Sequence, residues 1–152
     1  MTSFRPDHIG VTVPDLDAAV QFFLDALDAR LLYSEGPVRA DDDWMHRQLG
    51  VHPRAQLHAT MLQMPGGFRL ELFQYSAPDQ SQAMPRNSDW GASHLALEVS
   101  DIEVALDRLR AIPGVKVMGE VHETEEAPGT VVLWVYVTTP WGMQLELVSP
   151  KA

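Results

Sequence analysis

The chain contains an internal repeat, and this repeat constrains its fold more than any other feature. Residues 7–17 read DHIGVTVPDLD, and residues 93–103 read SHLALEVSDIE. In both segments a histidine is followed by alternating apolar residues, which is typical of a half-buried strand, and then by an aspartate that can cap a helix. A supersecondary unit that begins twice in the same way predicts two copies of one module.

The ends of the two modules match as well. GFRLEL at 67–72 corresponds to GMQLEL at 142–147, so each module carries a glutamate in its last strand, Glu71 in the first and Glu146 in the second. Apolar periodicity predicts the order strand, helix, strand, strand, strand in each module. The expected strands are 7–13, 29–36, 55–64, 67–75, 93–99, 115–123, 130–139 and 143–149, and the expected helices are 14–28 and 101–112.

Two segments lie outside the repeated pattern. Residues 38–54 have no strand pattern and are interpreted as a loop with a short helix expected over 44–49. They contain the insertion of the first module, RADDDWMHRQLG at 39–50. Residues 76–92 are rich in Pro, Ser, Asp and Asn, and we interpret them as the linker between module one (4–75) and module two (93–149). The acidic segment 120–126 is expected to be a solvated turn. The prediction is therefore a single two-module domain.

Composition narrows the classes of function. With 152 residues, 45% hydrophobic and 21% charged, the chain has the composition of a soluble globular protein. A formal net charge of −10, without a basic cluster, argues against nucleic acid and anionic membranes as partners. The chain has no signal-peptide pattern and no long apolar run, so a cytoplasmic location is expected. The absence of cysteine excludes disulfides, zinc–thiolate sites and a cysteine nucleophile.

Four repeat-equivalent residues stand out as candidate metal ligands: His8, Glu71, His94 and Glu146. Each alone is most simply a polar residue on the solvent face of an alternating strand. Together they change the interpretation, because Thr, Lys, Ser or Gln would serve a solvent face equally well, whereas His and Glu both bind divalent ions. Two imidazoles and two carboxylates suit Zn, Ni, Co, Mn or Fe. An approximate two-fold axis between the modules would bring the four to one centre.

At these residues the sequence resembles the vicinal oxygen chelate superfamily, which includes glyoxalase I, methylmalonyl-CoA epimerase, extradiol dioxygenases, fosfomycin-modifying enzymes and bleomycin-binding proteins. The segments that carry the resemblance are HIGVTVPDLDAAVQFF, HLALEVSDIEVAL, LELFQY and TPWGMQLELVS. The resemblance implies an α+β fold in which two tandem βαβββ modules form a cup-shaped mixed sheet with helices on the outside. It also implies one divalent metal ion in the cup, held by the same four residues, in a combination closest to that of glyoxalase I.

The function implied is that of a metal-dependent lyase, isomerase or epimerase acting on a small carbonyl or vicinal-oxygen substrate through a metal-stabilised enolate. Either Glu146 or Glu71 would be the catalytic base. An iron(II) extradiol-type ring-cleaving dioxygenase and a non-catalytic binding protein for an aromatic metabolite or antibiotic are the alternatives. The family also implies a homodimer. The sequence leaves open the substrate, the metal, glutathione dependence, the choice of base, and whether the site is built within one chain or across two.

Several further residues are candidates for a substrate pocket. Side-chain alternation places Arg69 and Phe73 on the strand face of Glu71, and Gln144 on that of Glu146. Arg69 or Gln144 would orient a polar substrate group or would make a contact at the rim. Four aromatic residues complete the set. Trp44 and Trp90 would form a lid over the pocket or would cover the core or a dimer contact, and Trp134 and Tyr136 would line the pocket or belong to the core. His52, His58 and His122 have no repeat partner and are interpreted as ordinary histidines.

Overall fold

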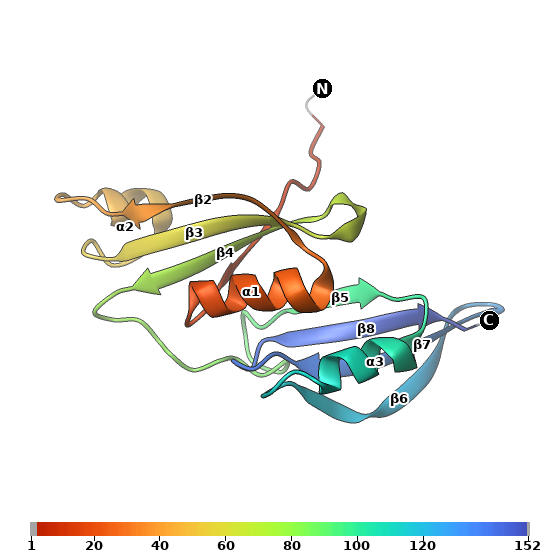
Figure 1. Cartoon of the computed structure of the whole chain (residues 1–152). Helices are drawn as coiled ribbons and strands as arrows, with labels where there is room; N and C mark the ends of the chain where they lie inside the picture. Colours follow the sequence, from red (N-terminus) through yellow and green to blue (C-terminus); the bar gives the residue numbers. More distant parts are fainter. Residues whose placement is uncertain (1–2, 152) are drawn as a thin grey trace. The chain divides into compact units, whose positions relative to one another are not determined.

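The structure, a computed structural model that describes residues 3–151, contains two compact units. The first unit ends at Gln82 and the second begins at Ala83, so the boundary falls inside the expected linker. Each unit is built around one four-stranded mixed sheet (Figure 1). The predicted α+β fold of two tandem βαβββ modules is therefore confirmed.

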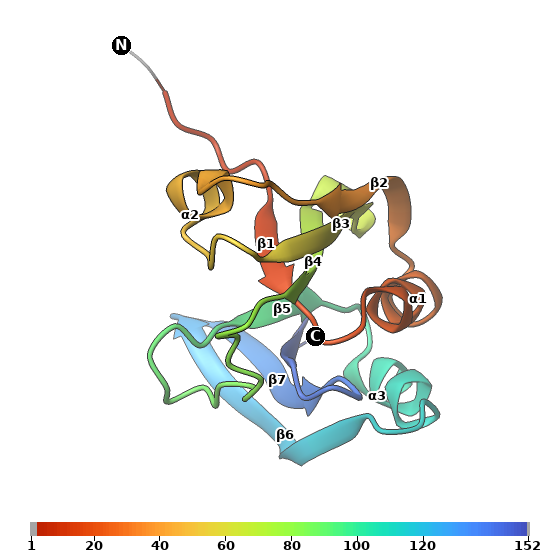
Figure 2. The same ribbon diagram turned by 90° about the vertical axis from the view of Figure 1, so that its left-hand side faces the viewer.

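The first unit contains seven elements: β1 (Ile9–Thr12), α1 (Leu16–Leu27), β2 (Arg30–Val38), α2 (Trp44–Leu49), β3 (Gln56–Gln63), the 3-10 turn η1 (Pro65–Gly67) and β4 (Arg69–Ser76). The strand order is β1-β4-β3-β2, with β1 parallel to β4 and the other pairs antiparallel (Figure 2). The first and last strands of the module are thus neighbours, which brings the start of the repeat beside its end.

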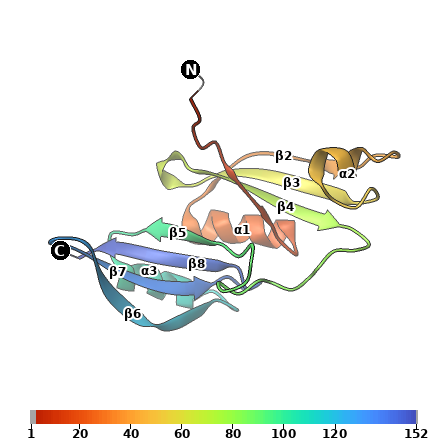
Figure 3. The same ribbon diagram turned by 180° about the vertical axis from the view of Figure 1, so that it is seen from behind.

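The second unit contains β5 (His94–Glu98), α3 (Ile102–Arg110), β6 (Lys116–Ala127), β7 (Thr130–Thr138) and β8 (Gln144–Pro150). Its strand order, β5-β8-β7-β6, is the same as that of the first unit, with β5 parallel to β8 (Figure 3). The two modules therefore share one topology as well as one sequence pattern.

Both long helices begin at the aspartates that the sequence indicates. The Asp15 carboxylate accepts a hydrogen bond from the backbone N–H of Ala18 at 2.9 Å. The Asp101 carboxylate accepts two, from the N–H groups of Glu103 and Val104 at 3.0 and 3.1 Å. These bonds satisfy amide groups that have no partner within the helix, and they fix where each helix starts.

Alternation in the last strand of each module separates the core from the candidate site. Leu70 and Leu72 of β4 are fully buried, and Gln74 on the same face accepts a hydrogen bond from the N–H of Leu16 at 2.7 Å, which places α1 over this face. Leu145 and Leu147 of β8 are buried in the same way. The glutamate between each pair of leucines consequently lies on the sheet face opposite the main core.

The insertion of the first unit packs on the face that carries Glu71. Met45 of α2 is fully buried against Leu57 and Ala59 of β3, and Phe73 and Tyr75 of β4 border this cluster. Residues on both faces of this sheet are therefore covered, on one face by α1 and on part of the other by the insertion. Among residues 3–151, no helix is long and apolar enough to cross a membrane.

Two expectations about local structure were wrong. Strand β2 does not end at Gly36 but continues to Val38 across the cis peptide bond between Gly36 and Pro37, with an irregular register. The acidic segment 120–126 is not a turn but part of β6, and its side chains are largely exposed. Strand β6 is an edge strand that pairs only with β7, so this part lacks the alternation that a half-buried strand shows.

Candidate metal and catalytic site

In the first unit, the fold brings His8 and Glu71 together. The parallel ladder between β1 and β4 pairs Gly10 with Glu71, and His8 lies two residues before Gly10. The His8 Nε2 atom lies 3.1 Å from the Glu71 Oε2 atom. The residue that opens the module therefore contacts the glutamate that the sequence places in its last strand.

The second unit repeats this geometry. Ala96 pairs with Glu146 in the ladder between β5 and β8, and the Nε2 atom of His94 lies 3.1 Å from the Oε2 atom of Glu146. The glutamate side chains are only 14% and 18% exposed. Neither glutamate is therefore the solvated side chain that strand alternation alone would predict.

An aspartate holds the imidazole of His8. The Nδ1 atom of His8 lies 2.8 Å from the Oδ2 atom of Asp7, and the Asp7 carboxylate also forms an ion pair with Arg69. The hydrogen bond with His8 is the largest effect on the pKa of the Asp7 carboxyl and lowers it; desolvation comes second and opposes it, and the charge of Arg69 lowers the pKa further, so that it lies below its usual value. The carboxylate is thus ionised at neutral pH and fixes the ring orientation.

This hydrogen bond has a consequence for the other ring nitrogen. Because the Asp7 carboxylate is an acceptor, Nδ1 of His8 is the donor and carries the proton. In a neutral imidazole, Nε2 then presents a lone pair, and the atom facing it at 3.1 Å is a carboxylate oxygen of Glu71, which is also an acceptor. Two facing acceptors need a cation between them, either a proton that makes the ring an imidazolium or a metal ion.

The donor chemistry fits a divalent ion. Two ligand atoms that each lie about 2.1 Å from one ion are about 3.0 Å apart in an octahedral arrangement and about 3.4 Å apart in a tetrahedral one. The separation of 3.1 Å in both His–Glu pairs lies within this range. The described residues contain no group of three or more His, Asp or Glu side chains close enough to hold a metal ion. Each unit therefore presents two ligands of the four that the sequence indicates.

A pocket of about 470 Å³ adjoins the pair of the second unit. His94 and Tyr136 line it together with Asn87, Ala92 and Ser93. Tyr136 lies opposite Glu146 in the ladder, and its ring contacts the ring of His94 edge-on, with 5.2 Å between the ring centres. Burial, and after it the charge of Glu146, raises the pKa of Tyr136, so its hydroxyl remains a hydrogen-bond donor at neutral pH.

Gln144 presents a buried acceptor beside this pair. It is the partner of His94 in the ladder between β5 and β8, and it lies on the strand face of Glu146. Its Oε1 atom is buried and has no hydrogen-bond partner among the residues that the structure describes. A buried acceptor without a partner is costly unless a ligand or water supplies a donor, so Gln144 is suited to accept a bond from a bound molecule.

The other predicted pocket residues lie in different surroundings. Arg69 is occupied by its ion pair with Asp7, and Phe73 packs against Tyr75 with 5.8 Å between ring centres. The Trp134 indole donates a hydrogen bond to the Thr124 hydroxyl at 2.8 Å and stacks on His122. Trp44 is partly exposed at the start of α2, and Trp90 is fully exposed. None of these five residues lines the pocket beside His94.

Three residues of this region escaped the sequence interpretation. Asp7 had a detectable signal, because a carboxylate directly precedes the candidate ligand His8. Asn87 lies in the linker, and Ser93 is the first residue of the expected strand 93–99, so no signal in the sequence assigns either of them to a pocket. Their position depends on how the linker returns to β5.

Comparisons with known proteins agree with this architecture. The family model described as Glyoxalase/Bleomycin resistance protein/Dioxygenase superfamily matches residues 5–147. A 2-epi-5-epi-valiolone epimerase from Actinomyces sp. is 47% identical over 145 residues, which cover 95% of this chain and 79% of that protein.

Solved structures share the fold at low identity. A glyoxalase family protein from Bacillus cereus is 21% identical with a TM-score of 0.78, and the match covers 100% of this chain and 97% of that one. A fosfomycin resistance protein, FosX, from Listeria monocytogenes, whose structure is a complex with Mn(II) and sulfate, is 16% identical with a TM-score of 0.63, and the match covers 99% and 95%.

Proposed function

Because the chain belongs to the glyoxalase/bleomycin resistance protein/dioxygenase superfamily, we propose that it is an epimerase that moves a proton at a carbon next to a carbonyl group. Its 47% identity to a 2-epi-5-epi-valiolone epimerase supports this reaction, and makes that compound the first substrate to assay. The two His–Glu pairs supply the acid–base and metal-binding groups that such a reaction uses.

We propose that His8, Glu71, His94 and Glu146 together hold one divalent ion, and that each module supplies half of the ligands. The observation that carries this proposal is the pair of facing acceptors, His8 Nε2 and Glu71 Oε2, which needs a cation. The equal separation of 3.1 Å in the second pair supports a shared role. Zn, Ni, Co, Mn and Fe all accept this set of ligands.

When bound, a divalent ion supplies Lewis acidity, which makes a C–H bond next to a coordinated carbonyl easier to break. In the proposed reaction, one glutamate accepts the proton at a carboxylate oxygen. Inversion requires that a proton return on the opposite face of the carbon, and the duplicated module offers a second carboxyl group for this step. We assign these roles to Glu71 and Glu146.

Two neighbours of the second pair position the substrate in this proposal. The Tyr136 hydroxyl, which stays protonated, donates a hydrogen bond to a substrate oxygen. Gln144 Oε1, which is buried and has no partner among residues 3–151, accepts a hydrogen bond from a substrate hydroxyl. Both residues orient the substrate and neither transfers the proton.

Proton exchange with solvent tests the proposal directly. In D₂O, 2-epi-5-epi-valiolone should gain deuterium at the epimerised carbon and convert to its epimer in the presence of the metal-loaded protein. Glu71→Gln and Glu146→Gln should each lower the rate about 10²- to 10⁴-fold, which is the usual contribution of a general base. Nuclear magnetic resonance follows both the exchange and the epimer.

Glu120→Gln is the matched control, because Glu120 is an exposed glutamate of β6. It should retain full activity, and all three variants should keep the circular dichroism spectrum and melting temperature of the parent. Near-native exchange in both Glu71→Gln and Glu146→Gln would refute the proton-transfer roles.

A further inference from the structure

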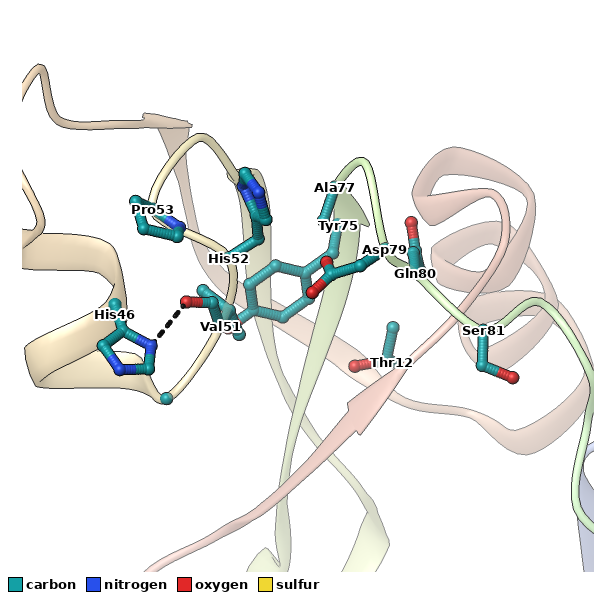
Figure 4. Close-up of a pocket in the computed structure, with 11 residues that line it drawn as sticks. Thr12, His46, Val51, His52, Pro53, Tyr75, Ala77, Asp79, Gln80 and Ser81 are labelled. Atoms are coloured by element: carbon teal, nitrogen blue, oxygen red, sulfur yellow. Dashed lines mark hydrogen bonds between the residues drawn. The ribbon is translucent and has the colours of Figure 1, made fainter.

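The first unit contains a second pocket that the proposed reaction does not use. It has a volume of about 690 Å³ and lies between the insertion that carries α2, the end of β4 and the segment that follows β4 (Figure 4). All the residues that line it fall between Thr12 and Ser81, inside the first unit. We propose that this pocket binds uncharged polyhydroxyl compounds.

The pocket lies on the same sheet face as Glu71. Tyr75, which lines the pocket, is four residues beyond Glu71 in β4, and Thr12, at the pocket edge, pairs with Phe73. At about 3.3 Å per residue, Phe73 and Tyr75 lie about 7 and 13 Å along the strand from Glu71. A molecule bound here therefore lies farther along the same sheet face than the His8–Glu71 pair and occupies a different site.

The insertion that forms one wall of this pocket is packed against the sheet. Met45 is 0% exposed and packs against Leu57, which is the ladder partner of Tyr75. This packing anchors α2 and the loop after it to the sheet. In Figure 4 the side chains of His52, Tyr75 and Asp79 extend from the loop, from β4 and from the segment after β4, which lie on different sides of the pocket.

The polar groups of the pocket have free hydrogen-bonding capacity. Within residues 3–151, the side chains of Thr12, Tyr75, Asp79 and Ser81 form no hydrogen bond or ion pair with another protein group. Three of them are hydroxyls, which both donate and accept, and the fourth is a carboxylate, which accepts from more than one donor. Burial, and then the charge of Glu71, raises the pKa of Tyr75, so its hydroxyl remains a donor.

His52 adds a directional donor. Its Nδ1 atom accepts a hydrogen bond from the backbone N–H of Arg54 at 3.0 Å, so the ring proton of the neutral form is on Nε2. Several donors and acceptors around one space match a ligand with several hydroxyl groups, because each hydroxyl can pair with either kind. A ligand with a single polar group would leave most of these protein groups without a partner.

The charge of the lining defines the class of ligand further. Asp79 contributes a carboxylate, and neither lysine nor arginine lines the pocket. A phosphate or carboxylate group would meet a like charge without a compensating cation, which costs binding energy. Hydroxyl groups instead donate to the Asp79 carboxylate, and hydrogen bonds to a charged acceptor are the stronger ones. The expected ligand is therefore uncharged.

Binding can be measured without turnover, using myo-inositol, a cyclic polyol that has no carbonyl group. The full-length protein is titrated at pH 8 and followed by two-dimensional ¹H–¹⁵N nuclear magnetic resonance. A failure of the exchange assay leaves this measurement unaffected, so the two proposals are tested separately.

We expect saturable shifts at the amides that line the pocket. Tyr75→Phe should weaken binding about 2- to 10-fold, and Asp79→Asn about 10-fold or more, as the loss of one neutral and one charged hydrogen bond predicts. Tyr33→Phe and Asp41→Asn are the matched controls, because both residues are exposed in the same unit and neither lines the pocket. The controls should stay within about twofold of the parent.

Two related probes test the chemistry. Cyclohexanol, a ring with a single hydroxyl, should bind at least about 10-fold more weakly than myo-inositol, and myo-inositol 1-phosphate should bind no more tightly than myo-inositol. Absence of saturable shifts with myo-inositol would overturn the proposal. So would binding that both Tyr75→Phe and Asp79→Asn leave unchanged, or tighter binding of the phosphate.

Discussion

His8 and His94 occupy equivalent positions in the two modules, but their neighbours differ. The residue before His8 is Asp7, which fixes its ring and is itself held by Arg69. The residue before His94 is Ser93, and the ring of His94 contacts Tyr136 instead. Orientation of a ligand ring by a carboxylate raises its basicity and preorganises it for a metal ion. The first pair is therefore the better organised of the two.

This difference leads to a prediction for Asp7. Asp7→Asn replaces the carboxylate that accepts from Nδ1 of His8 by a neutral amide, so the ring orientation is less well fixed. Loss of such a partner typically lowers metal affinity about 10- to 100-fold. Competition with a chromogenic chelator measures the affinity. Asp41→Asn, a change of the same chemistry at an exposed position, should leave it unaltered, and an unchanged affinity in Asp7→Asn would contradict the role of the aspartate.

The four candidate ligands could be predicted because the same residue type occurs at the equivalent position of both modules. His8 and His94 match, as do Glu71 and Glu146, and the structure brings each histidine to its own glutamate. Tyr75 and Asp79 could not be assigned to a pocket in this way. They belong to the end of β4 and to the segment beyond it, and the insertion that completes their pocket has no counterpart in the second module.

At the scale of elements, the two parallel strand pairs differ in how closely they pack. A Cβ atom on Gly10 would lie 2.7 Å from the Phe73 ring, which is closer than real contacts allow. The equivalent position in the second unit is Ala96, and the position equivalent to Phe73 is Val148. In the first unit the smallest residue therefore accompanies a large aromatic one, whereas the second unit has a slightly larger residue, Ala96, with a smaller partner, Val148.

We predict that Gly10→Ala destabilises the protein by about 1–3 kcal/mol, the usual cost of overpacking, because the Phe73 ring must move. In a Phe73→Val background, which reproduces the combination of the second unit, the same change should cost about 1 kcal/mol less. Urea unfolding of the parent, both single variants and the double variant measures the two costs. If Gly10→Ala costs the same free energy of unfolding in both backgrounds, the added methyl group does not clash with the Phe73 ring, and the prediction is wrong.

Elements with strong local signals were predicted well, and those that depend on their neighbours were not. The helices α1 and α3 carry an apolar stripe and a capping aspartate, and both begin where expected. The acidic part of β6 carries neither signal, because an edge strand with exposed side chains needs no alternation. Its pairing with β7, the next strand along the chain, decides its conformation, and the residues of the acidic segment carry no pattern that indicates this pairing.

At the scale of the whole molecule, duplication supplies like chemistry twice, and the insertion makes the two units different. Both units carry a His–Glu pair on the sheet face opposite the main core. Only the first has α2 packed on that face, with the pocket of about 690 Å³ next to it. We infer that the repeated parts serve the reaction and that the insertion serves ligand recognition. The homodimer and the cytoplasmic location stay predictions.

The metal content of the purified protein tests the central claim most directly. If the two modules hold one divalent ion through His8, Glu71, His94 and Glu146, elemental analysis should find about one ion per chain. His8→Ala and His94→Ala, one substitution in each unit, should both lose most of it, while His122→Ala, in which an imidazole outside both pairs is removed, should keep it. Equal metal content in the parent, His8→Ala and His94→Ala would contradict the shared site.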